Sequence, residues 1–196
     1  MSNRPASSPP PAPAAVYDRP SIVFHWASAL FILLLWGIAQ IWGELPRGTA
    51  LRHTLQETHV SLGIVFLFLF MGRILWRTRG GRSLPPPGPP LLARLARAGH
   101  AALYGLMAAL AVSGPLNFLL RGEEGSFFGL FPLPALLSPH RTLAHGVNEV
   151  HGFLATLLLI LAALHALAAL FHQFFLRDGT LARMIPALAR KGGQKG

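Results

Sequence analysis

The chain has 196 residues, of which 52% are hydrophobic and only 12% are charged, and it carries a formal net charge of +10. This composition excludes an ordinary soluble domain of the same size and indicates an integral membrane protein. The basic residues flank long apolar segments and form no single aromatic-laced patch, so we expect the anionic partner to be membrane lipid and not nucleic acid. The absence of cysteine excludes disulfides, iron–sulfur clusters, covalently attached haem and cysteine-ligated zinc. Any metal chemistry must therefore rest on the nine histidines.

The two ends of the chain differ in composition from the segment between them. Residues 1–19 are rich in proline and small side chains and lack the apolar core of a secretory signal, which predicts a disordered arm in the cytosol. Residues 20–186 are predicted to form one transmembrane domain, and residues 187–196 a basic tail. The proline-rich segment from Pro85 to Pro90 is expected to be a stiff loop inside the bundle.

Four apolar segments approach the length of about 20 residues that a helix needs to cross about 30 Å of hydrocarbon. They are Ile22 to Gly43, Thr58 to Trp76, Ala101 to Leu120 and Gly152 to Phe175. Backbone groups in lipid must be hydrogen-bonded within the chain, so each segment is predicted to be helical and the fold to be an all-α integral membrane four-helix bundle. Arg73 is expected to extend from the second span to the lipid headgroups, and Pro115 to kink the third span.

The distribution of basic residues predicts the orientation of the four spans. Thirteen of the 17 lysines and arginines fall on the side that also holds both ends of the chain. Only Arg47, Arg52, Arg121 and Arg141 fall on the other side. Positive charge is enriched in cytoplasmic loops, so both termini are predicted to be cytoplasmic and the opposite face periplasmic, in the inner membrane of a bacterium.

Histidines in the spans fall at two depths. His151 and His165 are 14 residues apart in the fourth span, which places them about 21 Å apart along a helix and only about 40° from the same direction. His25 lies near the cytoplasmic start of the first span, and His59 lies at the outer start of the second. Depth therefore pairs His25 with His165 on the inner side, and His59 with His151 on the outer side.

Two isolated histidine pairs suit a planar macrocycle held between helices by axial imidazoles better than they suit zinc, which requires a tetrahedral cluster. We therefore predict two haem b groups, each with two histidine ligands. Filled axial positions leave no site on the iron for a substrate, which favours electron transfer as the function. The alternative is a haem-free bundle, a transporter or scaffold, whose histidines serve packing or proton relay.

The remaining histidines have less specific interpretations. His172 shares the face of His165 and could contact a haem propionate or a quinone carbonyl, or it could extend to the interface. His100 precedes Tyr104 by one turn at the start of the third span, a pair suited to propionate contact or to helix capping. The histidines at 53, 140 and 145 are expected in outer loops, and the tryptophans in interfacial belts, with Trp26 also able to pack on a haem.

Short motifs throughout the chain resemble those of the bacterial cytochrome b561 family. They are SIVFHW around His25, HVSLG from His59, RILWR from Arg73, GHAALY around His100, RGEEGSFFG from Arg121, the pair His151 and His165, and RDGTLARMIP from Arg177. Together they cover residues 17–186 in order. The resemblance implies a four-helix transmembrane cytochrome b domain over residues 20–186, with two haems b whose axial ligands match the four paired histidines.

The resemblance also implies functional partners. One member of the family oxidises superoxide at the periplasmic face and passes the electron to ubiquinone, and outer cations attract the anion to the outer haem. Arg47 and Arg121 occupy comparable positions and are the candidate catalytic residues for a haem-dependent superoxide oxidase. Other relatives are haem subunits that connect quinone to a dehydrogenase, a hydrogenase or a periplasmic redox carrier, and this alternative remains open.

Overall fold

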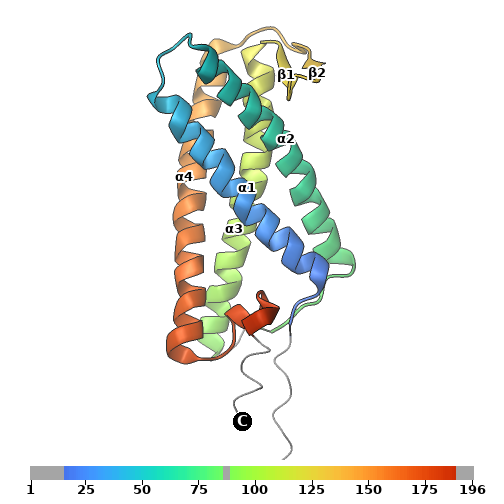
Figure 1. The fold of residues 1–196 in the computed structure, drawn as a ribbon, viewed down its shortest axis with the longest axis vertical. Helices are drawn as coiled ribbons and strands as arrows, with labels where there is room; N and C mark the ends of the chain where they lie inside the picture. Colours follow the sequence, from blue (N-terminus) through green and yellow to red (C-terminus); the bar gives the residue numbers. More distant parts are fainter. Residues whose placement is uncertain (1–15, 86–88, 189–196) are drawn as a thin grey trace, which may run out of the picture.

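A computed structural model describes residues 16–85 and 89–188 as a bundle of four long helices (Figure 1). The helices are α1 (Arg19–Glu44), α2 (Ala50–Arg79), α3 (Pro90–Arg121) and α4 (Arg141–Phe171). All four are long and apolar enough to cross a membrane, so the predicted all-α membrane bundle is confirmed. Most of the predicted N-terminal arm, part of the proline-rich loop and most of the basic tail lie outside the described residues.

Every helix extends beyond the apolar segment that predicted it. The prediction of loops around His53 and His145 was wrong, because these residues lie on α2 and α4. Each histidine Nδ1 lies 3.6 Å from the carboxylate of a glutamate one turn further along its helix, Glu57 and Glu149 respectively. Such i,i+4 pairs stabilise a helix where it continues outside the hydrocarbon. Hydropathy predicts only the apolar part of a helix, so it did not reveal these polar ends. Helix α3 likewise continues through Pro115.

The bundle consists of two helical pairs. Helix α3 packs along α4, and α1 packs along α2, whereas α4 approaches α1 much less closely. A small core of Phe66, Phe70, Met107 and Leu158 lies at mid-height. Many large apolar side chains elsewhere are exposed, as expected of helices that face lipid. The sparse contact between α4 and the α1–α2 pair is the feature that positions the site.

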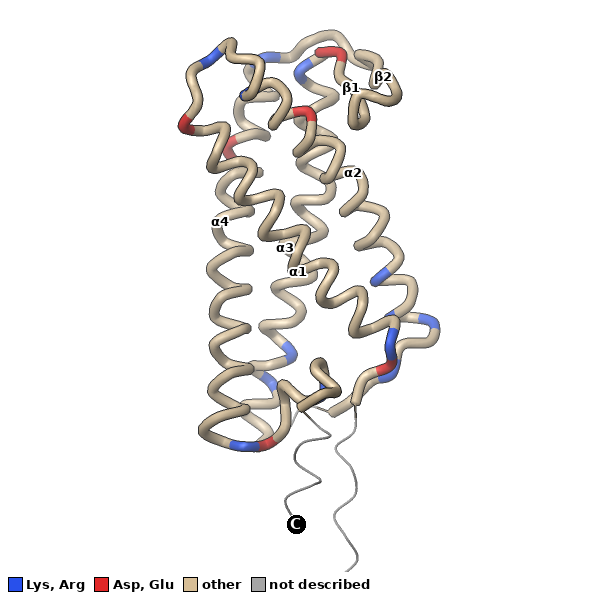
Figure 2. Tube along the Cα trace, in the orientation of Figure 1, with Lys and Arg blue, Asp and Glu red and all other residues tan. Residues whose placement is uncertain are grey.

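Charged residues are concentrated at the two ends of the bundle (Figure 2). The terminal end, at which the described residues begin with Val16 and stop with Leu188, carries Asp18 at the start of α1. The Asp18 carboxylate accepts hydrogen bonds from Trp76 Nε1 at 2.7 Å and from the backbone N–H groups of Arg82 and Ser21 at 2.8 and 3.2 Å. One side chain therefore caps α1 and joins it to the end of α2.

The opposite end, called the hairpin end, carries the only strands among the described residues. Strands β1 (Gly125–Phe127) and β2 (Phe131–Leu133) form an antiparallel hairpin between α3 and α4. At the terminal end, α4 continues into a single π-helical turn, η1 (His172–Leu176), followed by a 3₁₀ turn, η2 (Leu181–Arg183). Irregular helical turns of this kind often occur at functional sites.

Candidate cofactor-binding sites

The structure brings the four paired histidines together as the sequence predicts. The ring centroids of His25 and His165 lie 6.2 Å apart near the terminal end. The ring centroids of His59 and His151 lie 6.4 Å apart near the hairpin end. Helix α4 contributes one histidine to each pair, and α1 and α2 contribute the others across the sparse side of the bundle.

Both separations match the span of two imidazoles bound to one metal ion. Two metal–nitrogen bonds of about 2.0 Å, plus about 1.1 Å from each nitrogen to the centre of its ring, give about 6.2 Å. The ring planes within the pairs are inclined by 62° and 75°, which axial ligation permits because each ring can rotate about its metal–nitrogen bond. The residues present therefore fit two axially ligated haems.

We call His59 and His151 the outer pair, and His25 and His165 the inner pair, after the orientation that the sequence predicts. Hydrogen bonds at the outer pair leave Nε2 of each ring available to a metal. His59 Nδ1 lies 3.1 Å from the carbonyl oxygen of Leu35, which can only accept, so Nδ1 carries the proton and Nε2 is available to a metal. His151 Nδ1 lies 2.8 Å from the Ser113 hydroxyl, whose oxygen lies 3.4 Å from the carbonyl of Leu110. Supporting bonds of this kind hold metal-binding histidines in one tautomer and orientation. Ser113 was not predictable from the sequence, since nothing in the local pattern shows which residue faces His151.

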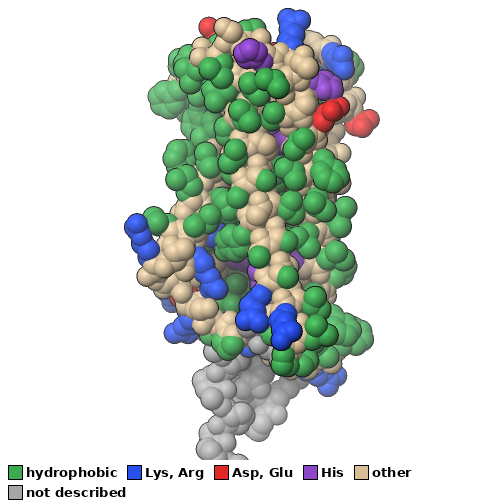
Figure 3. All heavy atoms as spheres, turned by 180° about the vertical axis from the view of Figure 1, so that it is seen from behind, with side chains coloured by type: hydrophobic (Ala, Val, Ile, Leu, Met, Phe, Trp, Pro, Cys, Tyr) green, Lys and Arg blue, Asp and Glu red, His purple; other side chains and the backbone are tan. Residues whose placement is uncertain are grey.

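Space beside the histidines is left by glycine. A Cβ atom added at Gly63, one turn from His59, or at Gly152, next to His151, would meet nothing within 4 Å. The same addition at Gly114 would touch the His151 ring at 3.4 Å, so glycine here lets α3 approach the imidazole closely. Seen from behind, apolar side chains cover the middle of the bundle, and imidazoles are visible in recesses beside the arginines of the terminal end (Figure 3).

Arg73 was predicted to extend to the lipid headgroups, and this prediction was wrong. Its Nε donates a hydrogen bond to the Tyr104 hydroxyl at 2.9 Å, and its guanidinium lies 5.0 Å from the centre of the same ring. The side chain therefore points from α2 toward α3, because the half-buried Tyr104 phenol offers both an acceptor and a π face. The motif RILWR identified the residue but not its direction.

His100 does not cap a helix, because α3 begins ten residues earlier at Pro90. Its ring centroid lies 5.2 Å from that of His165, closer than the 6.2 Å between His165 and His25. That separation is about 1 Å too short for two rings on one metal ion. His25 is therefore the better axial partner of His165, and His100 lies beside the pair with Tyr104 one turn away.

Polar groups at the hairpin end include the two candidate catalytic arginines. Arg47 is exposed, and Arg121 pairs with Glu123 at 2.6 Å. A third arginine, Arg52, was not singled out by sequence. Its Nη1 donates hydrogen bonds to the carbonyls of Trp42 at 2.5 Å and Leu45 at 2.8 Å, which closes the C-terminal end of α1. Trp42 in turn packs edge-on against His59 with 4.8 Å between ring centroids, so the clamp reaches the outer pair.

Of the other tryptophans, Trp26 is exposed, and its Nε1 donates a hydrogen bond to the carbonyl of Met184 at 3.1 Å. It also lies edge-on to His25, with 5.3 Å between ring centroids. Trp26 therefore connects the inner pair to the segment after α4.

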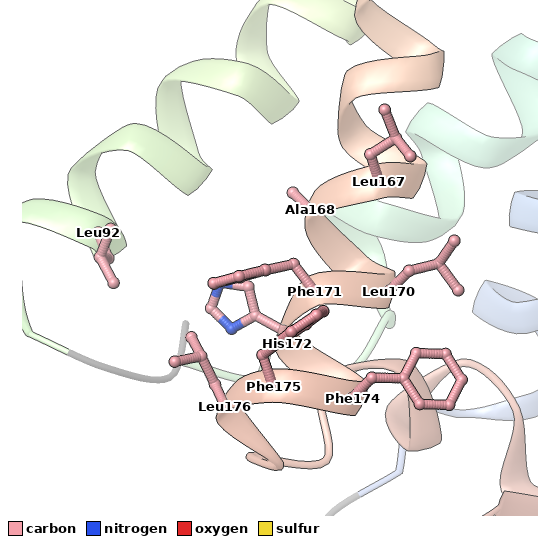
Figure 4. Close-up of a pocket in the computed structure, with 9 residues that line it drawn as sticks. All are labelled: Leu92, Leu167, Ala168, Leu170, Phe171, His172, Phe174, Phe175 and Leu176. Atoms are coloured by element: carbon pink, nitrogen blue, oxygen red, sulfur yellow. The ribbon is translucent and has the colours of Figure 1, made fainter.

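His172 lies at an apolar hollow at the terminal end of α4 (Figure 4). The hollow measures about 570 Å³ and is lined mainly by leucine and phenylalanine, including Leu92, Phe171 and Phe175. His172 Nδ1 lies 2.5 Å from the Asp178 carboxylate. Burial acts to raise the pKa of Asp178, but hydrogen bonds from Thr180 and His172 outweigh it and lower that pKa below its usual value.

Comparison with known proteins places the chain among membrane cytochromes. The profile of the family described as prokaryotic cytochrome b561 matches residues 16–187, and the chain belongs to this family. It is 35% identical over 174 residues to cytochrome b561 homolog 2 of Escherichia coli (strain K12), covering 86% of this chain and 90% of that protein. Over 171 residues it is 34% identical to a probable superoxide oxidase CybB of Yersinia pestis, covering 87% and 96%. Cytochrome b561 homolog 1 of E. coli (strain K12) is 29% identical, covering 87% and 97%.

Family membership makes the chain a bacterial membrane cytochrome of the b type that binds haem b and takes part in electron transfer. The resemblance first seen in the short motifs is thereby confirmed over most of the chain.

Proposed function

We propose that the chain binds two haems b, one between His25 and His165 and one between His59 and His151, and that it carries electrons across the membrane. The observation that supports this most directly is the pair of centroid separations, 6.2 and 6.4 Å. When bound, each haem supplies a one-electron iron couple. The protein positions the two groups at two depths by the rigid rise of α4, about 21 Å between its two histidines.

The composition of the purified protein tests this proposal. Reduction with dithionite in detergent should give a low-spin b-type spectrum, with about two haems per chain by pyridine haemochrome assay. A colourless preparation would instead support a haem-free transporter or scaffold. One haem per chain would contradict the two-site arrangement but leave the family assignment intact.

We further propose that the terminal end faces the cytoplasm of a bacterial inner membrane and that ubiquinone reacts there. The described residues at this end are rich in arginine, as cytoplasmic loops are. The hollow beside His172 is apolar enough for an isoprenoid quinone and offers an imidazole to its carbonyl, with Arg177 five residues further on. His100 and Arg73, beside the inner pair, suit contact with haem propionates.

Superoxide is a candidate electron donor at the hairpin end, and the similarity to a probable superoxide oxidase favours it. Two superoxide anions would each lose one electron and become O₂. One quinone would take up the two electrons together with two protons and become a quinol. Exposed Arg47 and Arg121 could attract the anion, although Glu123 offsets part of the Arg121 charge. A haem subunit that receives electrons from a dehydrogenase, a hydrogenase or a periplasmic carrier is the alternative.

Charge reversal at these arginines separates the two roles. In stopped-flow experiments, the combined Arg47→Glu and Arg121→Glu variant should be reduced by superoxide about tenfold more slowly at low salt, and less so at high salt. Arg94→Glu, an exposed arginine at the terminal end, is the control and should not change the rate. If superoxide reduces the unmodified protein slowly, and the charge-reversal variant at the same rate, the result would support a haem subunit that receives electrons from a protein partner.

The hydrogen bond between Ser113 and His151 leads to a prediction about the outer haem. Ser113→Ala should shift the reduction potential of one haem and leave the other unchanged, because only His151 loses its Nδ1 partner. Ser113→Thr retains the hydroxyl and should restore the potential. Potentiometric titration of the two b-type absorbance components measures both shifts. Equal potentials in Ser113→Ala and the unmodified protein would show that Ser113 does not act on the ligand.

A further inference from the structure

The loop between α3 and α4 contains a long segment without charge. Residues 125–137 read GSFFGLFPLPALL, bounded by Arg121, Glu123 and Glu124 on one side and by His140 and Arg141 on the other. In the part of the chain that the structure describes, the turn of the β1–β2 hairpin leaves three apolar side chains uncovered: Phe128, Leu130 and Phe131 are 44%, 71% and 63% exposed. An apolar group of this kind at a surface marks contact with a second apolar phase or partner.

The hairpin is held against α2 by a hydrogen-bonded cluster around Ser61, which is fully buried. The Ser61 hydroxyl accepts the N–H of Phe128 at 2.9 Å and lies 3.3 Å from the carbonyl of Ser126. The Ser126 hydroxyl donates to the Glu57 carboxylate at 3.1 Å. Buried polar groups that satisfy one another in this way fix both partners in place. The hairpin therefore has one position relative to α2.

The turn itself is shaped so that its apolar tip projects. Phe128 and Gly129 have φ angles of 51° and 70°, and Leu130 N–H closes the turn onto the Phe127 carbonyl at 2.9 Å. A positive φ is costly for an aromatic residue, and the hydrogen bond of Phe128 N–H to Ser61 helps to retain it. The exposed side chains are consequently a structured feature and not the by-product of a loose loop.

The depth of Ser61 places the tip inside the apolar part of the membrane. On α2, Ser61 lies 15 residues from Trp76, which precedes Arg77 at the terminal end. Fifteen residues span about 22 Å along a helix, and any tilt of the helix shortens this distance along the membrane normal. The hydrocarbon layer is about 30 Å thick, so Ser61 lies within it when Trp76 lies at its opposite boundary. Glu57, the nearest acid, lies one turn further out. The hairpin lies beside the helices at this end of the bundle (Figure 1).

From depth, absence of charge and exposure, we infer that the hairpin tip inserts into the lipid leaflet at the hairpin end. Acyl chains then cover Phe128, Leu130 and Phe131, in continuity with the lipid-facing surface of the helices. The charged residues that bound the segment remain in the headgroup region, where water can solvate them. The loop joining α3 to α4 is thereby anchored both to α2 and to the membrane.

The natural lack of cysteine makes a direct test possible. Leu130→Cys and, as the matched control in the same loop, Ser138→Cys each introduce a single thiol for a nitroxide label. In the full chain reconstituted in phosphatidylcholine nanodiscs, power-saturation EPR compares collisions with oxygen, which dissolves in lipid, and with a water-soluble nickel chelate. The label at 130 should favour oxygen and collide with nickel about tenfold less often than the label at 138, because the chelate is excluded from hydrocarbon.

Equal nickel accessibility at 130 and 138 would overturn the inference and leave the tip as a surface for a protein partner in water. Phe131→Cys provides a second position if Leu130→Cys does not fold, and an unchanged haem spectrum identifies the folded variants. Reaction with a water-soluble maleimide before labelling gives an independent measure, since only a hydrated thiolate reacts. The result does not depend on the number of haems or on the electron donor, so its failure would leave the proposed function unaffected.

Discussion

Replacing His165 with alanine should reduce the haem content from about two to about one per chain, because the inner haem loses an axial ligand while the outer pair is intact. One of the two b-type components should disappear from the absorbance spectrum of the reduced protein, and the other should remain at full height. His151→Ala should remove the other component. Pyridine haemochrome assay of the purified variants, together with a potentiometric titration, distinguishes the two sites.

The same helix offers a matched control. His145 lies on α4 six residues before His151, but it is exposed and pairs only with Glu149. His145→Ala should therefore retain both haems. A His165→Ala variant that still binds two haems would refute the assignment of this residue, and one that binds none would indicate that the two sites assemble only together. His100→Ala should retain haem, since its ring lies too close to His165 to be the second ligand.

Replacing Asp18 with alanine should destabilise the terminal end by about 2 kcal/mol. Loss of an N-cap typically costs about 1 kcal/mol, and a donor left without its acceptor accounts for the remainder. The carboxylate caps α1 through Ser21 and accepts the Trp76 indole N–H and the Arg82 backbone N–H, so one substitution separates α1 from α2. The apparent midpoint of thermal unfolding in detergent, followed by circular dichroism, should fall by several degrees. Glu44→Gln, an exposed acid at the other end of α1, is the control and should not alter it.

The contribution of Asp18 should also depend on pH. Burial acts to raise its pKa, but hydrogen bonds from the Arg82 backbone, from Trp76 and from Ser21 outweigh it and hold the pKa well below the usual value of about 3.9. A carboxyl whose pKa is lower in the folded state stabilises fully above its unfolded pKa and loses that contribution as the pH falls toward the folded pKa. The difference in thermal midpoint between Asp18→Ala and the unmodified protein should therefore be constant near neutral pH and shrink below about pH 4. A constant difference down to pH 3 would exclude this linkage.

The position of α4 explains how one helix could serve the two proposed cofactors. His151 and His165 project to nearly the same side, and the helix meets α1 and α2 only sparsely. Tight packing at this interface would leave no room for a macrocycle, whereas α4 packs closely along α3. The core around Phe66 and Leu158 fills the height between the two pairs and keeps them as separate sites. Electron transfer between two such haems would therefore cross a layer of buried apolar side chains.

The features that were predictable from the sequence are those that depend only on the spacing of residues along the chain. Long apolar segments report on membrane-crossing length, so the four spans were predictable. Fixed rise and rotation along a helix place His151 and His165 on one side, and antiparallel spans then match them by depth with His59 and His25. These predictions needed no knowledge of which helices touch.

Tertiary structure alone decided the features that depend on which helix faces which. Arg73 turned toward Tyr104 and not toward the headgroups, and Ser113 met His151, because α2 and α4 each present these faces to α3. Helix ends outside the hydrocarbon were misplaced, since a polar segment held by i,i+4 pairs carries no hydropathy signal. The hairpin was not foreseen either: its position rests on contacts between Ser61 and Phe128, which are 67 residues apart in the chain. Local pattern encodes depth and direction within one helix, but contacts between distant segments arise only when the whole bundle packs.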